Sequence, residues 1–219
     1  MKTISIILLS LLLLTALWAE ENEYRPSDQS VLILPTAYTI PAGTITFTDY
    51  EILILHFTYS PMDRLHLGLM FPFPAVKEFV DYITPGFKYT YFISETLNMA
   101  VGGSYTNYYN AHSLNHIVSI GKPDKSVHLM LGWADADNSK SNLIFGVGYR
   151  AALKPSTSFL GELITTQRIL EKDPDALLML GLRFHGKKVS WDLGGARAIG
   201  ETDSELWLIP FLKTTVILN

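Results

Sequence analysis

Residues 126–133 read SVHLMLGW, and residues 142–149 read NLIFGVGY. In both stretches a large apolar residue alternates with a small or polar one, as Leu129 and Leu131 alternate with His128 and Gly132. Side chains leave a strand on opposite faces with a period of two residues, so these stretches predict strands whose faces meet different surroundings. The second face is small and weakly polar, which fits the lining of a narrow barrel better than the charged surface of a soluble sandwich.

The same alternation recurs along most of the chain and predicts an all-β fold. We expect a single antiparallel transmembrane β-barrel of about twelve strands, with ten as the alternative. Pro35 interrupts the first candidate strand, and the long second one has room for a bulge near Asp49 and Tyr50. The candidate strands are 31–40, 43–60, 63–73, 83–93, 97–107, 113–121, 126–134, 142–153, 158–168, 177–185, 189–198 and 205–218.

The connections between these strands alternate between short and long from residue 60 onward. Outer-membrane barrels have short turns on the periplasmic side and longer loops outside. The alternation therefore predicts both termini on the periplasmic side, as an even strand count requires. The tight turn from Pro41 to Gly43 departs from the rule, because it would be a short connection on the outside.

The N-terminus has the pattern of an export signal. Lys2 precedes an almost wholly apolar run from Ile4 to Leu17, and Ala19 is a small residue before an acidic pair. The run is short for a spanning helix, which needs about 20 residues, so cleavage is favoured over an uncleaved anchor. We expect a signal peptide at 1–19, a flexible periplasmic lead-in at 20–30 and the barrel at 31–219.

Composition excludes several classes of function. The chain of 219 residues has no cysteine, which excludes disulfides and thiolate metal sites, and its net charge of −4 argues against nucleic acid as a partner. The six histidines are scattered, and no metal, nucleophile or phosphate-loop motif occurs. We therefore expect no catalytic residues, no metal site and no cofactor.

In this pattern the chain resembles the small outer-membrane β-barrels of Gram-negative bacteria. The features that carry the resemblance are the export signal, the alternating strands, the alternating loop lengths and the aromatic residues near strand ends. The resemblance implies residence in the outer membrane, with its lipids and the barrel-insertion machinery as partners and a porin-like fold. The expected lipid-facing aromatic girdle consists of Tyr59, Tyr82, Tyr105, Trp133, Tyr149 and Trp191.

Four charged residues fall on the expected lumen face of consecutive strands: Arg150, Glu162, Arg183 and Asp192. They alternate in sign, and a charge in a poorly hydrated lumen needs a partner. We expect a charge ladder that pairs Glu162 with both arginines and Arg183 with Asp192. The ladder would close the lumen as a structural plug, with a solute-selecting constriction as the alternative.

The function expected from these observations is an integral outer-membrane barrel with a structural, binding or small-solute pore role. The main alternative is a soluble secreted β-sandwich or calyx that binds an apolar ligand. A membrane-barrel enzyme is the minor alternative, and our expectation is that the chain is not an enzyme. The solute remains unassigned at this point.

Overall fold

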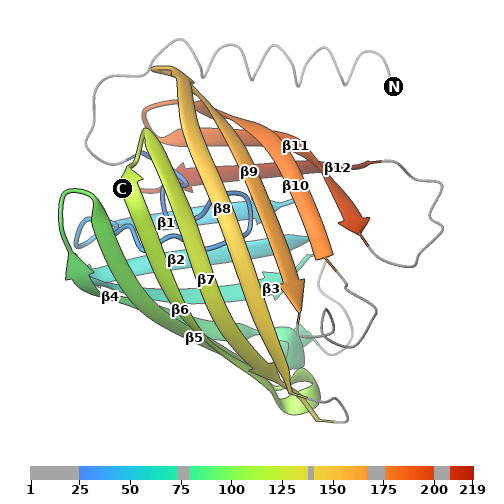
Figure 1. Cartoon of the computed structure of the whole chain (residues 1–219). Coiled ribbons are helices and arrows are strands. Elements are labelled where there is room, and N and C mark those ends of the chain that lie inside the picture. Colours follow the sequence, from blue (N-terminus) through green and yellow to red (C-terminus); the bar gives the residue numbers. More distant parts are fainter. Residues whose placement is uncertain (1–24, 74–78, 138–140, 167–175, 200–207) are drawn as a thin grey trace.

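The computed structural model describes residues 25–73, 79–137, 141–166, 176–199 and 208–219. These residues form twelve strands and two short 3-10 helices, η1 (Phe79–Tyr82) and η2 (Tyr108–Asn110). The strands are β1 (Ile45–Tyr50), β2 (Ile54–Met62), β3 (Leu65–Pro72), β4 (Thr84–Ile93), β5 (Leu97–Thr106), β6 (Ala111–Lys122), β7 (Lys125–Asp135), β8 (Asn142–Lys154), β9 (Thr157–Thr166), β10 (Ala176–His185), β11 (Val189–Ile199) and β12 (Ile209–Ile217). Each pairs antiparallel with its neighbours in the chain, and β12 pairs with β1 to close the ring (Figure 1). The expected all-β barrel of twelve strands is confirmed.

The two faces of the wall differ as the alternation predicted. On β7, Leu129 and Leu131 point outward and are exposed, whereas Ser126 and His128 point inward and are buried. The exposed large side chains recur around the wall, because every strand offers its aliphatic and aromatic residues to the outside. A water-soluble protein does not expose so continuous an apolar surface, whereas a lipid-facing barrel wall requires one. The soluble sandwich or calyx is therefore not favoured.

Except for the turn at 51–53, the connections at one end of the barrel are longer than those at the other. At one end the strands are joined by 63–64, 94–96, 123–124, 155–156 and 186–188, and at the other by 51–53, 73–83, 107–110, 136–141, 167–175 and 200–208. The C-terminus lies at the short-turn end, where the Asn219 side chain donates a hydrogen bond to the carbonyl of Gly43. We call this the terminal end and the opposite one the loop end. The turn from Pro41 to Gly43 therefore lies at the terminal end, with the short turns, and not at the end of the longer loops as expected.

The second predicted strand, 43–60, is wrong as a single element, because it contains the turn at 51–53 between β1 and β2. Glu51 and Ile52 both have positive φ, at 58° and 64°. Two consecutive residues with positive φ are typical of the tight type I′ hairpin, which normally uses Asn or Gly. Neither residue is a usual turn former, so a bulge near Asp49 and Tyr50 is expected from the sequence where the structure has a turn.

The first predicted strand, 31–40, is also wrong. Residues 25–42 form an irregular segment inside the ring of strands, which we call the plug; it is the blue trace within the barrel in Figure 1. The Arg25 guanidinium donates to the Asp124 carboxylate, and the Ala42 amide donates to the Asp63 carboxylate. Asp124 and Asp63 both lie in turns at the terminal end. The plug therefore enters and leaves by the terminal end. The wall begins at Ile45 rather than at Val31, and residues 25–30 lie in the lumen rather than in a free lead-in.

The predicted signal peptide, 1–19, lies outside the described residues, as does the start of the predicted lead-in. Among the described residues, no helix is long and apolar enough to cross a membrane.

Candidate functional site: the lumen and its plug

The tip of the plug is a tight reversal of the chain. Ser30 and Pro35 form an isolated antiparallel bridge, and the amide of Val31 donates to the carbonyl of Leu34 at 2.8 Å. Val31, Leu32 and Leu34 are fully buried and pack against inward-facing apolar residues of the wall, among them Leu160. The tip therefore inserts a small apolar core into the lumen.

Two glycines of β8 make room for this core. A Cβ atom at Gly146 would lie 2.3 Å from Leu34 Cδ1, and one at Gly148 would lie 2.7 Å from Val31 Cγ2. Any larger residue at these positions would displace the tip, so the close approach requires glycine. This is the structural role of the Gly146-Val147-Gly148 stretch.

Glu162 on β9 binds the backbone of the tip. Its carboxylate is buried and accepts hydrogen bonds from the amides of Leu32, Ile33 and Leu34 at 2.9 to 3.2 Å. Successive amides that converge on one anion form a compact anion-binding concavity. The plug therefore satisfies this buried charge through three backbone donors.

A three-membered charge cluster lies beside Glu162. Arg183 on β10 binds Asp192 on β11 through two nitrogens, at 2.7 and 2.8 Å, and Lys213 on β12 binds the same carboxylate at 2.8 Å. Both cations also donate to plug carbonyls. Arg183 binds those of Ser27, Ser30 and Val31, and Lys213 binds that of Leu32 at 2.7 Å. The cluster joins the last strands of the wall to the plug, and all three of its side chains are fully buried.

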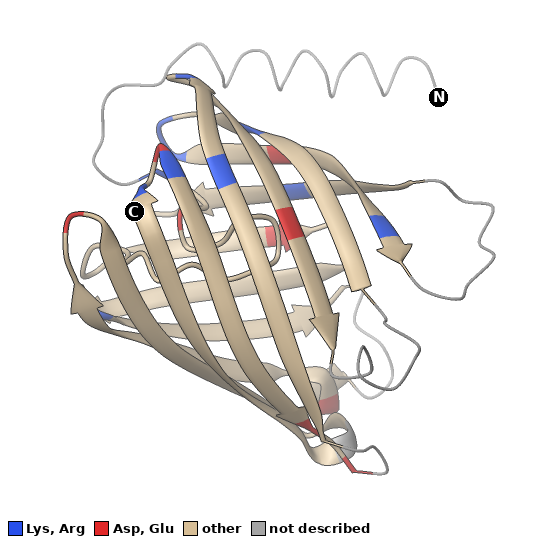
Figure 2. Ribbon diagram, in the orientation of Figure 1, with Lys and Arg blue, Asp and Glu red and all other residues tan. Residues whose placement is uncertain are grey.

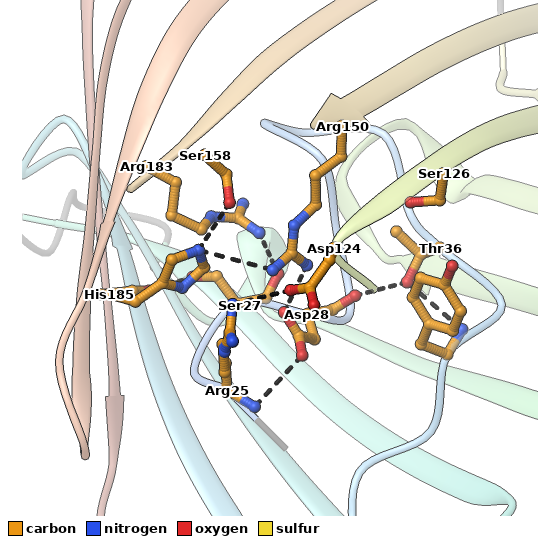
Figure 3. A network of polar contacts seen from close by, with 12 residues as sticks. Arg25, Ser27, Asp28, Thr36, Asp124, Ser126, Arg150, Ser158, Arg183 and His185 are labelled. Carbon is orange, nitrogen blue, oxygen red and sulfur yellow. Dashed lines mark hydrogen bonds and ion pairs between the residues drawn. The ribbon is translucent and has the colours of Figure 1, made fainter. Parts of the chain in front are cut away.

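Arg150 on β8 pairs with the plug rather than with a neighbouring strand. Its guanidinium donates to the Asp28 carboxylate at 2.5 Å, and both side chains are almost fully buried. Figure 3 shows this pair beside His185, with Arg25 reaching the Asp124 carboxylate at the mouth of the barrel. The His185 ring also meets the Ser158 hydroxyl at 2.9 Å. The base of the plug is thus fixed by charge at the terminal end.

The opposite wall binds residues 36–40, the part of the plug that leads from the tip back to the terminal end. Lys88 on β4 donates to the carbonyls of Thr36 and Tyr38 at 2.8 and 2.9 Å. Three further contacts follow along the same stretch: Ser119 accepts from the amide of Ala37, Thr90 donates to its carbonyl, and His66 accepts from the amide of Ile40. Burial raises the pKa of Tyr38, whose neutral hydroxyl donates to the carbonyl of Gly121.

The four expected ladder residues are all buried on the lumen face, but not in one ladder. Arg183 and Asp192 bind each other, whereas Glu162 binds plug amides and Arg150 binds Asp28. The expected pairing of Glu162 with the two arginines is corrected, because the plug supplies nearer partners. Figure 2 shows charged positions on β8, β9 and neighbouring strands. The missed charged residues are Asp28, Lys88 and Lys213. Lys88 and Lys213 lie at inward positions of strands and could have been included on that ground.

The expected girdle residues lie on the outward face or at strand ends. Tyr59, Tyr105 and Tyr149 are exposed, and Trp133 and Trp191 occupy outward positions of β7 and β11. Tyr82 lies in η1 instead of a strand, where its ring stacks on Tyr108 with centroids 4.1 Å apart.

The lumen also holds a cavity between the plug and strands β2 to β6. Its volume is about 210 Å³, and the plug contributes Gln29 and Pro35 to its wall. Four glycines line it: Gly68, Gly86, Gly102 and Gly103. Within the described ranges, no group of three or more His, Cys, Asp and Glu side chains is arranged to hold a metal ion.

Comparison with known proteins adds only distant likenesses. No family model matches the chain, and no curated protein matches it. Among solved structures, OccAB2 from Acinetobacter baumannii is 10% identical with a TM-score of 0.42, over 80% of this chain and 58% of that one. An anion-selective porin from Comamonas acidovorans is 9% identical with a TM-score of 0.40, over 75% and 57%. LpxR from Salmonella typhimurium is 8% identical with a TM-score of 0.45, over 80% and 99%.

The expectation that the chain is not an enzyme is corrected by this comparison. Outer-membrane barrels include enzymes, so the barrel pattern by itself gives no ground for excluding catalysis. At such low identity the likeness concerns the fold alone. A closed ring of twelve strands with an apolar outer face is the architecture of an outer-membrane β-barrel, and the chain has that architecture.

Proposed function

We propose that this protein is a closed outer-membrane barrel whose lumen is sealed by its own N-terminal segment, so that it does not act as an open pore. The observation that carries the proposal is the plug. Its tip is fully buried in the lumen, and charged side chains from both sides of the wall bind its backbone. Wide aqueous channels are typical of barrels with 16 or more strands, and a ring of twelve leaves room that one chain segment can fill.

The strength of this seal is supported by the kind of contacts that make it. Glu162, Arg183, Lys213 and Lys88 all bind backbone groups of the plug. Hydrogen bonds with one charged partner are roughly twice as strong as neutral ones. Displacing the plug would leave these charges without their partners in a narrow lumen, which is costly. We expect the closed state to dominate at equilibrium.

Conductance in a planar lipid bilayer tests this proposal. The wild-type protein is expected to give no steady conductance. Leu34→Asn is expected to open the barrel intermittently, because it places an amide among the apolar residues that receive the tip. The matched control is Ile33→Asn, since the neighbouring Ile33 side chain is 38% exposed whereas Leu34 is fully buried.

A large and steady wild-type conductance would refute the closed barrel. Equal opening by the two asparagine variants would show that the buried tip does not form the seal.

The orientation of the barrel is a separate expectation. We propose that the loop end faces the outside, because outer-membrane barrels carry their longer loops there. The chain has no cysteine, so single cysteines can be introduced without interference. In intact cells a membrane-impermeant maleimide is expected to label cysteine at Asp137, which is exposed at the loop end, and to spare cysteine at Lys154, at the terminal end. Reversed labelling would mean that the barrel is inserted the other way.

A further inference from the structure

Lys88 differs from the other buried cations of the lumen. Arg150 is paired with Asp28, and Arg183 and Lys213 share Asp192. Lys88 is only 9% exposed, yet no carboxylate among the described residues lies within salt-bridge distance of it. Its ammonium donates to two backbone carbonyls of the plug, which satisfies two of its three N–H donors. A buried ammonium whose partners are all neutral has no negative charge to compensate it.

This charge lines the cavity between the plug and strands β2 to β6. The volume of about 210 Å³ is smaller than the range of about 300–1,000 Å³ that is typical of sites for drug-sized ligands. The cavity therefore suits a small molecule. Met70 and Ile117 line it as well, so the space beside Lys88 has apolar walls.

Glycines keep the cavity open. A Cβ atom at Gly68 would lie 2.6 Å from His56 Nε2, and one at Gly102 would lie 2.7 Å from Asn115 Oδ1. The ends of the His56 and Asn115 side chains therefore occupy the space above glycines of the adjacent strands. A wall built from ordinary residues would push both side chains into the space that a ligand would occupy.

Two neutral polar groups complete the lining. Asn115 Oδ1 is buried and has no hydrogen-bond partner among the described residues, although such atoms are normally satisfied. Rotating the amide by half a turn would present its N–H donors to an acceptor. His56 Nε2 is held only by a long contact of 3.5 Å to Thr58 Oγ1. One cation and two adaptable polar groups in an apolar pocket are what a small anion with an apolar body requires.

We propose that this cavity is a binding site for a small carboxylic acid with an apolar body, whose carboxylate pairs with Lys88. The apolar part lies against Met70 and Ile117. The inference rests on the closed barrel proposed above, because the plug supplies part of the cavity wall and the two carbonyls that hold Lys88 in place. The ligand thus contacts the segment that seals the lumen.

The test uses the full mature protein in detergent, with benzoate as the probe and benzyl alcohol and inorganic phosphate as comparisons. Benzoate is expected to bind by isothermal titration calorimetry, whereas benzyl alcohol lacks the charge and phosphate lacks the apolar body. Lys88→Met is expected to weaken benzoate binding by at least about tenfold, since a charge-assisted contact is lost. The matched control is Lys125→Met, which removes an exposed lysine outside the cavity.

Because Lys88 also holds the plug, a second variant tests the site without touching a plug contact. Met70→Trp places a larger side chain in the cavity and is expected to abolish benzoate binding. Conductance is measured on the same samples. A closed wild-type barrel that does not bind benzoate, or that binds it equally in Lys88→Met or Met70→Trp, would overturn the acid site alone. Equal binding of phosphate would overturn the apolar acid, and an open wild-type barrel would overturn the plug itself.

Discussion

Asp192→Asn is expected to destabilise the folded barrel by about 3–5 kcal/mol, the usual cost of breaking a buried ion pair by removing one partner. The change is nearly isosteric, so packing is preserved and charge is lost. Arg183 and Lys213 would both remain buried without the carboxylate that they now share at 2.7 to 2.8 Å. Their remaining partners are plug carbonyls, which carry no full charge. The measurement is the urea dependence of the folded band on unheated detergent gels.

The matched control is Asp137→Asn, which neutralises an exposed acidic residue at the loop end. We expect it to leave the unfolding midpoint within experimental error of wild type. If Asp192→Asn were equally harmless, the cluster would be solvated and the lumen would hold water rather than a seated plug. A Glu162–Arg183 ion pair would mean that removing Arg183 rescues the Glu162→Gln variant. Because Glu162 binds backbone amides instead, we expect no such rescue.

Leu131→Arg and Val147→Arg are expected to impair folding by about 2–4 kcal/mol each if they lie near the bilayer midplane. Both side chains point outward from the middle of their strands and are 51% and 48% exposed. An arginine there would face lipid without a partner. The yield of heat-modifiable barrel after refolding into vesicles measures the effect.

Gly132→Ser is the inward-facing control for these variants. A Cβ atom at Gly132 would make only ordinary contacts, the nearest at 3.4 Å from Ile144 Cβ, and a hydroxyl can face the lumen. We expect a mild effect. Similar losses at Leu131 and Gly132 would mean that the two faces of the wall have been exchanged.

The strands of the barrel wall could be predicted from sequence because the alternation that marks each strand lies within a short stretch of the chain. A lipid-facing strand shows its two faces in ten residues, and β7 and β8 were recovered to within two residues of their ends. The plug could not be separated from a strand in the same way. Residues 31–34 are Val, Leu, Ile and Leu without alternation, a run that is equally consistent with a strand buried on both sides.

The partners inside the lumen could not be predicted because they are remote in sequence. Asp28 lies 122 residues before Arg150, and the three amides that bind Glu162 lie about as far away. The spacing of charges along neighbouring strands gives the correct face for each side chain, but the nearest partner depends on what fills the lumen. Two features of the sequence could have indicated a plug: several charged residues at inward strand positions, and an apolar segment at 31–41 that contains Pro35 and Pro41.

The plug also imposes an order on the folding of the chain. Many contacts of the first described residues are with Glu162, Arg183, Ser190 and Lys213, which belong to the last four strands. These contacts span more than a hundred positions, and β1 meets β12 only when the ring is complete. Such long-range contacts make folding slow, because the entropy of closing large loops is lost before they form. Because the plug binds side chains of the last strands, it can dock only when those strands are in place, and we expect it to settle at about the stage at which β12 pairs with β1.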